Sequence, residues 1–294
     1  MNDLRKSLLV DYKVTNAREE RAEEAAVILS YFSNHDLENG RILDIGCGNG
    51  ATTKWFSQHA NTYSIGIEIH NNQFKILQRK NQKLNYLQAS GLKTPFKDKT
   101  FHTVILNDVL EHVSYLEATA LFQEINRILD TNGQLYVSVA NKYQIREPHS
   151  NLLLISWLPR WIYSSVVRSL FHDDVYPYTV RRFQDLAKNT NFSTKDLSWY
   201  YVAKKIRNLN YIGNTIIRPV LQILKDMKII GSFGFRKFLQ TFSVLIFVLK
   251  KVSTNENRYS QPLPHSTTRD GIEFIFNPPI APEERVQTVS TWSL

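Results

Sequence analysis

The stretch RILDIGCGNG, residues 41–50, decides the fold of this chain. Its first half is a short apolar run that predicts a buried strand, and its second half holds three glycines in five residues. Glycine adopts positive φ and lets the backbone approach a ligand closely, so this loop favours a cradle for a bound molecule over a simple turn. A helix begins near Ala51, and a glycine loop between a strand and a helix is typical of a nucleotide-binding α/β sheet.

Apolar runs and amphipathic segments alternate on both sides of this loop. A lead-in helix is expected over residues 18–32, and further helices over 71–81 and 115–129, the last stopped by residues 130–133. Strands are expected over residues 63–67, 84–89, 103–106 and 134–140. Strands that alternate with helices of roughly 10 to 15 residues predict a doubly wound α/β fold with a mostly parallel sheet.

The second half of the chain completes this Rossmann-like sheet. A helix over residues 181–189 and strands over 194–200 and 242–249 bring the prediction to seven strands. The intervening residues, about 203–240, are expected to form a helical, basic insertion before the last strand. Residues 1–252 then make one domain, and the Pro-, Ser- and Thr-rich residues 253–294 are expected to be a mostly disordered tail.

Positive charge is concentrated in the second half of the chain. The net charge is +9, and residues 142–251 hold 18 Lys and Arg against 6 Asp and Glu. Such an excess attracts nucleic acid, anionic lipid headgroups or a phosphorylated substrate, and it is equally compatible with plain solvation.

Cysteine usage and the apolar runs indicate the compartment. Cys47 is the one cysteine, so no internal disulfide and no cysteine-based zinc cluster can form, and no metal site is expected. No apolar stretch approaches the roughly 20 residues of a membrane-spanning helix, and the start of the chain lacks the apolar segment of a secretory signal. We therefore expect a cytoplasmic protein without a transmembrane segment.

The spacing of the glycines discriminates between nucleotide ligands. The dinucleotide fingerprint is G-x-G-x-x-G, whereas residues 46–50 read G-x-G-x-G after Asp44 and lack the Lys-Ser/Thr of a triphosphate-binding loop. Glu68 ends the next predicted strand, where a carboxylate can accept hydrogen bonds from both hydroxyls of a ribose. The pattern therefore implies a ligand that carries a ribose.

These motifs resemble those of the class I S-adenosylmethionine-dependent methyltransferases, of the methyltransferase-domain type. Residues 43–50 are similar to the first motif of that family, and residues 66–68 to its second. Residues 92–102 resemble the stretch that enters the fourth strand, and residues 107–113 the motif that leaves it. The resemblance implies an enzyme whose cofactor is S-adenosyl-L-methionine.

The resemblance also implies a set of cofactor-binding residues at the carboxyl ends of the strands. They are Asp44, Gly46, Cys47, Gly48, Gly50, Glu68, Ile69, Ser90, Gly91, Asn107, Asp108 and Val109. Ser90 stands where the family commonly has an acidic residue for the adenine amino group. Adenine recognition is therefore either weaker here or uses the Ser90 hydroxyl.

The acceptor side is expected just beyond the fourth and fifth strands. His112 is the candidate catalytic base for a hydroxyl acceptor, and the alternative is that it packs against or caps the following helix. The segment after the fifth strand supplies a candidate substrate-binding set, and the alternative is an ordinary polar loop. Its members are Tyr143, Arg146, Glu147 and His149.

The expected reaction is methyl transfer to a small-molecule, lipid or saccharide acceptor. The Arg-Glu-Pro-His stretch and the Leu- and Trp-rich segment to Trp161 resemble methyltransferases associated with cell-surface saccharide assembly, which suggests O-methyl transfer in glycan or lipid metabolism. The basic, aromatic second half would suit peripheral contact with a membrane surface.

Two other classes stay open as alternatives. A nucleic-acid methyltransferase would be expected to carry an Asn- or Asp-Pro-Pro-Tyr motif after the fourth strand, where residues 107–110 read Asn-Asp-Val-Leu, so nucleic acid is disfavoured as a partner. A protein methyltransferase is the related alternative. A non-catalytic S-adenosylmethionine-binding protein would usually have lost the glycine loop or Glu68, and both are intact.

Overall fold

The structure is a computed structural model of the 294-residue chain. It describes residues 18–29, 37, 40–59, 62–80, 85–144, 152–171, 174–198 and 244–252. The expected insertion at residues 203–240 and the expected tail at residues 253–294 lie outside the described residues.

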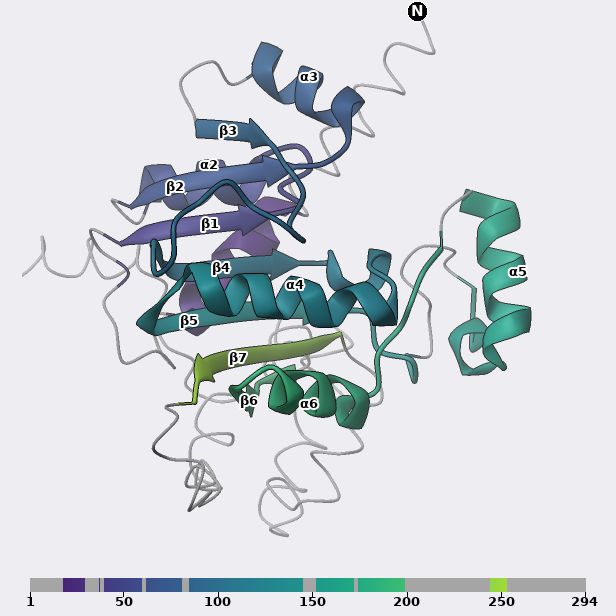
Figure 1. Cartoon of the computed structure of the whole chain (residues 1–294). Helices are drawn as coiled ribbons and strands as arrows, with labels where there is room; N and C mark the ends of the chain where they lie inside the picture. Colours follow the sequence, from purple (N-terminus) through teal and green to yellow (C-terminus); the bar gives the residue numbers. More distant parts are fainter. Residues whose placement is uncertain are drawn as a thin grey trace, which may run out of the picture.

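A seven-stranded sheet forms the centre of the described chain, with the strand order β3-β2-β1-β4-β5-β7-β6. The strands β1 to β5 run parallel, whereas β7 is antiparallel to both β5 and β6. Figure 1 shows the strands stacked from β3 at the top to β6 near the bottom. The strands are β1 (Arg41–Ile45), β2 (Tyr63–Glu68), β3 (Asn85–Gln88), β4 (Phe101–Asn107), β5 (Leu129–Val139), β6 (Phe192–Asp196) and β7 (Leu245–Lys251). The predicted doubly wound, mostly parallel α/β fold is confirmed.

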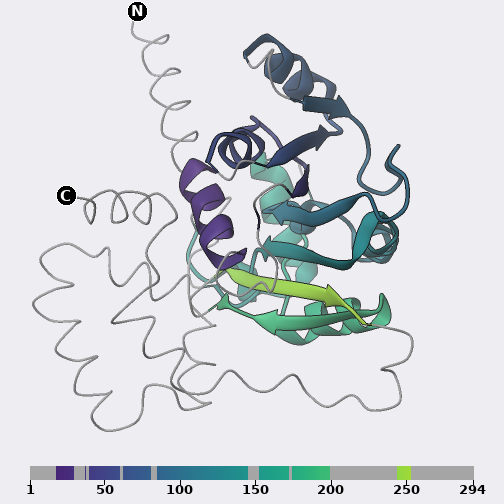
Figure 2. The ribbon, with the colours of Figure 1, turned by 90° about the vertical axis from the view of Figure 1, so that its left-hand side faces the viewer.

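Helices cover both faces of the sheet. Residues 18–29 are helical and lie with α2 on one face, while α4 and α6 lie on the other. Figure 2 shows the purple helix of residues 18–29 beside the sheet, and Figure 1 shows α4 in front of β4 and β5. The helices are α2 (Ala51–His59), α3 (Asn71–Lys80), α4 (Tyr115–Ile128), α5 (Arg160–Phe171) and α6 (Val180–Asn189), with short 3-10 turns η1 (Leu110–His112) and η2 (Ile155–Trp157).

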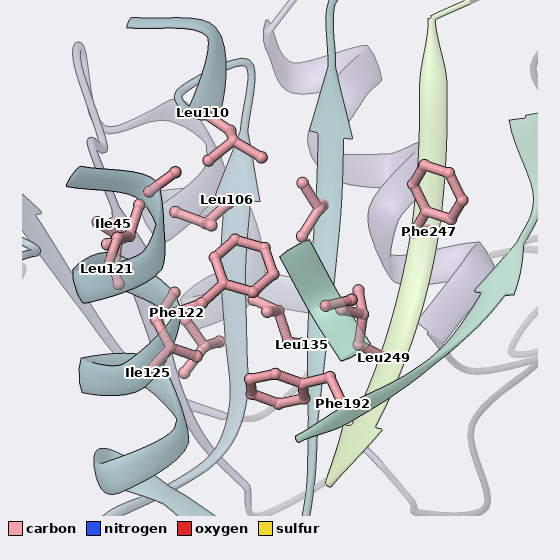
Figure 3. Close-up of a cluster of buried hydrophobic side chains, with 14 of the residues drawn as sticks. Ile45, Leu106, Leu110, Leu121, Phe122, Ile125, Leu135, Phe192, Phe247 and Leu249 are labelled. Atoms are coloured by element: carbon pink, nitrogen blue, oxygen red, sulfur yellow. The ribbon is translucent and has the colours of Figure 1, made fainter. Parts of the chain in front are cut away.

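The two-sided cover explains why the middle of β4 is apolar on both faces. In β4, Val104 and Leu106 join the core under α4 and α6, whereas Ile105 between them joins the core under α2 and the helix of residues 18–29. Side chains alternate between the two faces of a strand, so apolar residues are favoured at successive positions when both faces are buried. Figure 3 shows the core under α4, with Phe122 reaching toward the sheet.

Several strand boundaries differ from the prediction, most of all the start of β5. The helix α4 ends at Ile128 and β5 begins at once at Leu129, so residues 130–133 lie within β5 and not in a turn. They fall where the register between β4 and β5 shifts, because Phe101 pairs with Leu129 but Thr103 pairs with Gln134. The turn-forming residues thus lie at an irregularity of the β4–β5 pairing.

The sixth and seventh strands are also displaced from their predicted positions. The strand β6 begins at Phe192 and ends at Asp196, where the Asp196 Oδ1 accepts hydrogen bonds from Ser198 N at 2.9 Å and Ser198 Oγ at 2.7 Å. This side-chain turn stops the strand before the predicted end at residue 200. The strand β7 continues to Lys251, two residues beyond its predicted end.

Candidate cofactor and acceptor site

The carboxyl ends of β1 and β4 define the candidate site. These two strands are neighbours, while the chain proceeds from β1 to β2 and β3 on one side and from β4 to β5 on the other. Ligands of doubly wound sheets bind at such a switch point, outside the carboxyl ends of the strands. Most of the predicted cofactor-binding residues lie in the segments that leave β1, β2 and β4.

The glycine loop after β1 is held by the neighbouring strand β2. The Ile67 carbonyl oxygen accepts hydrogen bonds from Gly46 N at 2.8 Å and Cys47 N at 3.0 Å. Gly46 and Gly48 have φ values of +70° and +55°, a region that side chains rarely adopt. A Cβ on Gly46 would lie 2.7 Å from a methyl of Val109, so the residue after β4 packs directly on this loop.

Glu68 ties the end of β2 to the same loop. Its Oε2 accepts a hydrogen bond from Gly48 N at 2.9 Å, and its Oε1 accepts one from His70 N at 2.9 Å. The residue is buried, with 3% of its surface exposed. A carboxylate has about four acceptor positions, so two remain for the hydroxyls of a ribose. Glu68 thus lies beside the glycine loop, and its role toward a ribose stays a prediction.

Asp44 lies beneath the loop in a buried position. Thr53, in the first turn of α2, donates a hydrogen bond from its hydroxyl to Asp44 Oδ2 at 2.7 Å. Burial raises the pKa of Asp44 to about 7, while the hydrogen bond from Thr53 and the charge of Arg18 act in the opposite direction. Burial likewise raises the pKa of the Cys47 thiol above its ordinary range, so Cys47 contributes an uncharged side chain to the loop.

Asn107 and Asp108 are held at the end of β4 by Ser138 of β5. The Ser138 hydroxyl lies 2.7 Å from Asn107 Oδ1 and 2.8 Å from Asp108 Oδ1, and Asp108 N donates to Ser138 Oγ at 3.0 Å. Asp108 has a φ of +54°, a conformation that aspartate tolerates better than most residues. Ser138 was not singled out from the sequence, because a buried serine inside a strand carries no local functional signal.

Two arginines of the lead-in helix reach across the site. Arg18 Nη1 lies 3.4 Å from Asn49 Oδ1 and occupies the space that a Cβ on Gly48 would fill. Arg21 Nη2 lies 3.6 Å from Asp108 Oδ2. Residues three apart share a helix face, so this helix places one guanidinium over the loop after β1 and another beside the residue that follows β4. The sequence reasoning used only the apolar face of this helix and missed both arginines.

The segment after β3 lines the far side of the predicted cofactor site. Ser90 Oγ accepts a hydrogen bond from Leu92 N at 3.2 Å, which leaves the hydroxyl hydrogen available to another acceptor. A Cβ on Gly91 would lie 2.8 Å from a methyl of Ile45, so glycine is needed for the close packing on β1. Ile69 follows Glu68 with 58% of its surface exposed, as expected for a side chain beside a bound ligand.

His112 lies beyond the end of β4, at the last position of η1. Its backbone N donates to the Val109 carbonyl oxygen at 3.0 Å, and the residue is exposed. Ser114, and not His112, caps the following helix, because the Ser114 hydroxyl accepts from Glu117 N at 3.3 Å. Ser114 therefore takes the capping role that was the alternative for His112, whereas packing of His112 and its role as a base both stay predictions.

Of the predicted substrate-binding residues, Tyr143 is described and is 46% exposed. Its ring packs edge-to-face against Trp157, with the ring centroids 5.9 Å apart. The other three members of the set, Arg146, Glu147 and His149, lie outside the described residues.

Two tyrosines and two arginines form a cluster near His112 that was not predicted from the sequence. Tyr176 N donates to the Glu111 carbonyl oxygen at 2.7 Å, which brings Tyr176 next to Tyr115 with ring centroids 5.3 Å apart. The guanidinium carbon of Arg160 lies 4.2 Å from the Tyr176 ring centroid, and that of Arg182 lies 3.9 Å from the Tyr115 ring centroid. These residues come from α4, α5, α6 and the segment before α6, so no local sequence pattern predicts that they lie together.

With this geometry in place, comparison with known proteins assigns the domain. Residues 43–137 match the family described as "Methyltransferase domain". This part of the chain, which carries the glycine loop, Glu68 and His112, is a class I S-adenosylmethionine-dependent methyltransferase domain. The family uses S-adenosylmethionine as its methyl donor.

Several curated relatives match parts of the chain. An uncharacterised protein of Methanocaldococcus jannaschii is 39% identical over 121 residues, which are 41% of this chain and 48% of the relative. The fatty-acid O-methyltransferase of Mycolicibacterium smegmatis is 28% identical, over 38% of this chain and 42% of the relative. The sterol 24-C-methyltransferase of Saccharomyces cerevisiae is 23% identical, over 63% of this chain and 54% of the relative. The chain thus spans about half the length of the curated relatives it matches.

A solved structure confirms the fold. The crystal structure of an S-adenosylmethionine-dependent methyltransferase from Mesorhizobium loti superposes with a TM-score of 0.54 at 15% identity, covering 78% of this chain and 98% of that one. Among the described residues, no helix is long and apolar enough to cross a membrane. The same residues contain no group of His, Cys, Asp and Glu that could hold a metal ion.

Proposed function

We propose that this protein transfers the methyl group of S-adenosylmethionine to a small-molecule, lipid or saccharide acceptor, as an O-methyl transfer in cell-surface glycan or lipid metabolism. The observation that carries the proposal is the pairing of Glu68 with Gly48 N at the switch point of the sheet, with the exposed His112 on the neighbouring strand end. Donor-binding groups and a candidate base therefore lie at one edge of the sheet.

The residues of the donor side fit S-adenosylmethionine. Glu68 offers carboxylate oxygens for the ribose hydroxyls, and the glycine loop brings backbone close to them. Arg18 and Arg21 offer guanidinium groups that suit the carboxylate at the amino-acid end of the molecule. When bound, S-adenosylmethionine would supply a methyl group for transfer, and its sulfur would keep the electron pair of the broken S–C bond.

The residues of the acceptor side have to align a nucleophile and take its proton. An acceptor hydroxyl oxygen forms the new O–C bond, and we assign its proton to the imidazole of His112. General-base assistance of this kind contributes roughly 10² to 10⁴ in rate. The remaining acceleration comes from holding the oxygen in line with the methyl group and excluding water.

The names of two relatives support a lipid-like acceptor. One is a fatty-acid O-methyltransferase and the other a sterol 24-C-methyltransferase, so related domains act on apolar molecules by different methyl transfers. We also propose that the basic, aromatic second half of this chain contacts the membrane surface where such acceptors reside.

The direct test supplies S-adenosylmethionine with a labelled methyl group to the full-length protein together with a cell extract. The extract is then separated into lipid, saccharide, nucleic-acid and protein fractions. We expect the label in the lipid or saccharide fraction. Label confined to nucleic acid or protein would overturn the acceptor class, and cofactor binding without label in any fraction would indicate a non-catalytic binding protein.

The role of His112 is tested by His112→Asn, once an acceptor is known. We expect kcat to fall about 10²-fold or more while the affinity for S-adenosylmethionine stays unchanged, because the imidazole contacts the acceptor and not the donor. A reduction of only a few-fold would show that another group, or water, takes the proton.

A further inference from the structure

A segment with many exposed apolar side chains lies on the side of the sheet where the parallel strands end and where we expect the acceptor to bind. We define the apolar ridge as residues 152–161, in which six large hydrophobic side chains are exposed. They are Leu152 (42%), Leu153 (68%), Leu154 (48%), Trp157 (46%), Leu158 (38%) and Trp161 (74%). Half of the twelve exposed large hydrophobics in the described chain thus fall within ten consecutive residues. Exposed apolar residues are usually scattered over a surface, so their concentration in one short segment indicates a binding surface.

The ridge has a fixed base. Trp157 Nε1 donates to the Gln144 carbonyl oxygen at 3.0 Å, and the buried Ser156 donates to the same oxygen at 3.3 Å. Leu154 has a φ of +58°, which leucine rarely adopts, and its side chain is nevertheless exposed. The unfavourable backbone conformation of Leu154 is therefore not offset by burial of its side chain. Such conformations are concentrated at ligand-binding segments. The fold therefore holds these side chains outward.

The charge around the ridge is positive. Residues 152–171 contain Arg160 and Arg168 and no acidic residue, but Arg168 forms an ion pair with Asp174, with Nη2 2.6 Å from Oδ1, so Arg160 supplies the uncompensated charge of this segment. Arg160 stacks on the Tyr176 ring, and Arg182 on the Tyr115 ring, so aromatic faces hold both guanidinium groups in place. Within the part of the chain that the structure describes, neither arginine forms an ion pair with a carboxylate. An apolar surface with Trp and fixed Arg at its edge matches the interface of an anionic bilayer, where aromatic rings lie at headgroup level and Arg meets phosphate.

The position of the ridge connects it to the reaction. The residue before His112, Glu111, accepts the hydrogen bond from Tyr176 N, and Tyr176 carries Arg160 of the ridge on its ring. Figure 1 shows α5, which begins at Arg160, standing beside the sheet at the edge where β4 ends. An object that contacts the ridge therefore lies on the side from which the acceptor would reach His112.

We propose that the apolar ridge docks the protein on the surface of an anionic phospholipid bilayer and presents the acceptor opening to it. This inference rests on the proposed lipid-type acceptor and adds the surface through which the protein reaches it. Leu153 and Trp161 insert among the acyl chains and headgroups, and Arg160 meets the phosphates.

The test is sedimentation of the full-length protein with vesicles of phosphatidylcholine and phosphatidylglycerol, and with vesicles of phosphatidylcholine alone. The double variant Leu153→Ser/Trp161→Ser should lower partitioning to the anionic vesicles about tenfold or more, because two exposed side chains no longer insert. Arg160→Gln should lower it roughly fivefold on anionic vesicles and leave neutral vesicles unaffected. Ile76→Ser on α3, where the isoleucine is 50% exposed far from the ridge in sequence, is the matched control and should bind as the unaltered protein does.

The outcomes separate docking from acceptor class. Absence of vesicle binding by the unaltered protein at low salt, or equal binding by the double variant and by Ile76→Ser, would overturn the docking proposal. A change from dimer to monomer in the double variant, without a change in vesicle binding, would identify the ridge as an interface between copies and overturn it too. Labelled methyl transfer into the lipid fraction is measured on the same proteins, so vesicle binding without lipid labelling would instead contradict the proposed acceptor.

Discussion

Gly48 is the residue on which the donor site depends most directly. Its φ is +55°, and a Cβ there would collide with the guanidinium of Arg18. We therefore expect Gly48→Ala to weaken binding of S-adenosylmethionine at least about tenfold, because the loop must change its backbone conformation to accommodate the alanine side chain. Isothermal titration calorimetry measures the effect. An affinity equal to that of the unaltered protein would show that the loop does not shape the cofactor site.

Glu68 allows a milder change at the same site. Glu68→Gln keeps the size of the side chain but removes the charge that accepts hydrogen bonds from Gly48 N and His70 N. Charge-assisted hydrogen bonds contribute about 1.5 to 3 kcal/mol, so we expect the affinity for S-adenosylmethionine to fall by roughly one to two powers of ten. The exposed Asp185→Asn on α6 serves as the control. If both variants bind alike, Glu68 is a structural carboxylate only.

Asp44 gives the protein a pH dependence of known sign. Burial raises its pKa from the ordinary 3.8 to about 7, so between these values the folded chain holds a proton that the unfolded chain releases. This group's contribution to stability is therefore fully present below about pH 4 and is lost as the pH rises through about 7. Urea denaturation at pH 5 and pH 8 should show a larger loss of unfolding free energy in the unaltered protein than in Asp44→Asn. Equal losses would contradict the assignment.

At the level of elements, a carboxylate on α4 binds the segment between β3 and β4 to this helix through hydrogen bonds. Glu124 on α4 accepts hydrogen bonds from Thr94 N at 2.7 Å and Thr94 Oγ1 at 2.6 Å, while Arg127 bridges Glu124 and Asp98. The hydrogen bonds from Arg127, and those from Thr94, lower the pKa of Glu124 to about 2. The segment that follows Ser90 and Gly91 is thereby fixed to α4 next to the predicted adenine side.

Replacing Glu124 by Gln should loosen this segment. The stabilisation from a lowered carboxyl pKa is present above about pH 4.5 and is lost as the pH falls toward 2, so the unaltered protein should lose this contribution in acid. We expect Glu124→Gln to lower the unfolding free energy at pH 7 by about 1 to 2 kcal/mol and to flatten its decline below pH 4.5. Chemical denaturation across this pH range measures both effects. An unchanged acid limb would place the acid sensitivity in other carboxylates.

The sequence predicted elements where local pattern and tertiary environment agree. The run of residues 41–45 became β1 with those bounds, because an apolar run followed by glycines has few alternatives. The segment of residues 130–133 was predicted to be a turn from its Asp, Asn and Gly, and it lies within the bounds of β5, although the ladder to β4 passes from Leu129 directly to Gln134 and leaves these four residues out. The turn-forming residues therefore interrupt the regular pairing, while the paired residues on either side, Leu129 and Gln134, set the bounds of the strand.

The same distinction applies to the site. The places of the glycine loop, Glu68 and the residues after β4 could be predicted, because each lies at the end of its strand or directly after it. Ser138, Arg18 and the ring pair of Tyr115 and Tyr176 could not, because their roles arise only when distant segments pack together. Their residue types alone are common on any surface or in any core.

For the whole molecule, β7 connects the last strand to the rest of the sheet, because it lies between β5 and β6 and pairs with both. Phe247 of β7 stacks on Phe183 of α6, with ring centroids 4.0 Å apart and planes inclined by 9°, and is fully buried. We expect Phe247→Ala to lower the unfolding free energy by about 3 to 5 kcal/mol, because it empties the core between α6 and the sheet. Leu116→Ala on α4, where the leucine is 90% exposed, should stay within about 0.5 kcal/mol. Similar values for the two variants, measured by urea denaturation, would contradict this picture of the core.

The order of the strands also constrains how the chain can be made. On the ribosome, β5 and β6 emerge well before β7, yet β7 lies between them and β6 pairs with no other described strand. Until Lys251 has left the exit tunnel, β5 presents an open edge and β6 has no partner. Synthesis is vectorial, so this protein completes its sheet only after nearly all of the described chain has been translated, and an arrested nascent chain would be a natural client for chaperones.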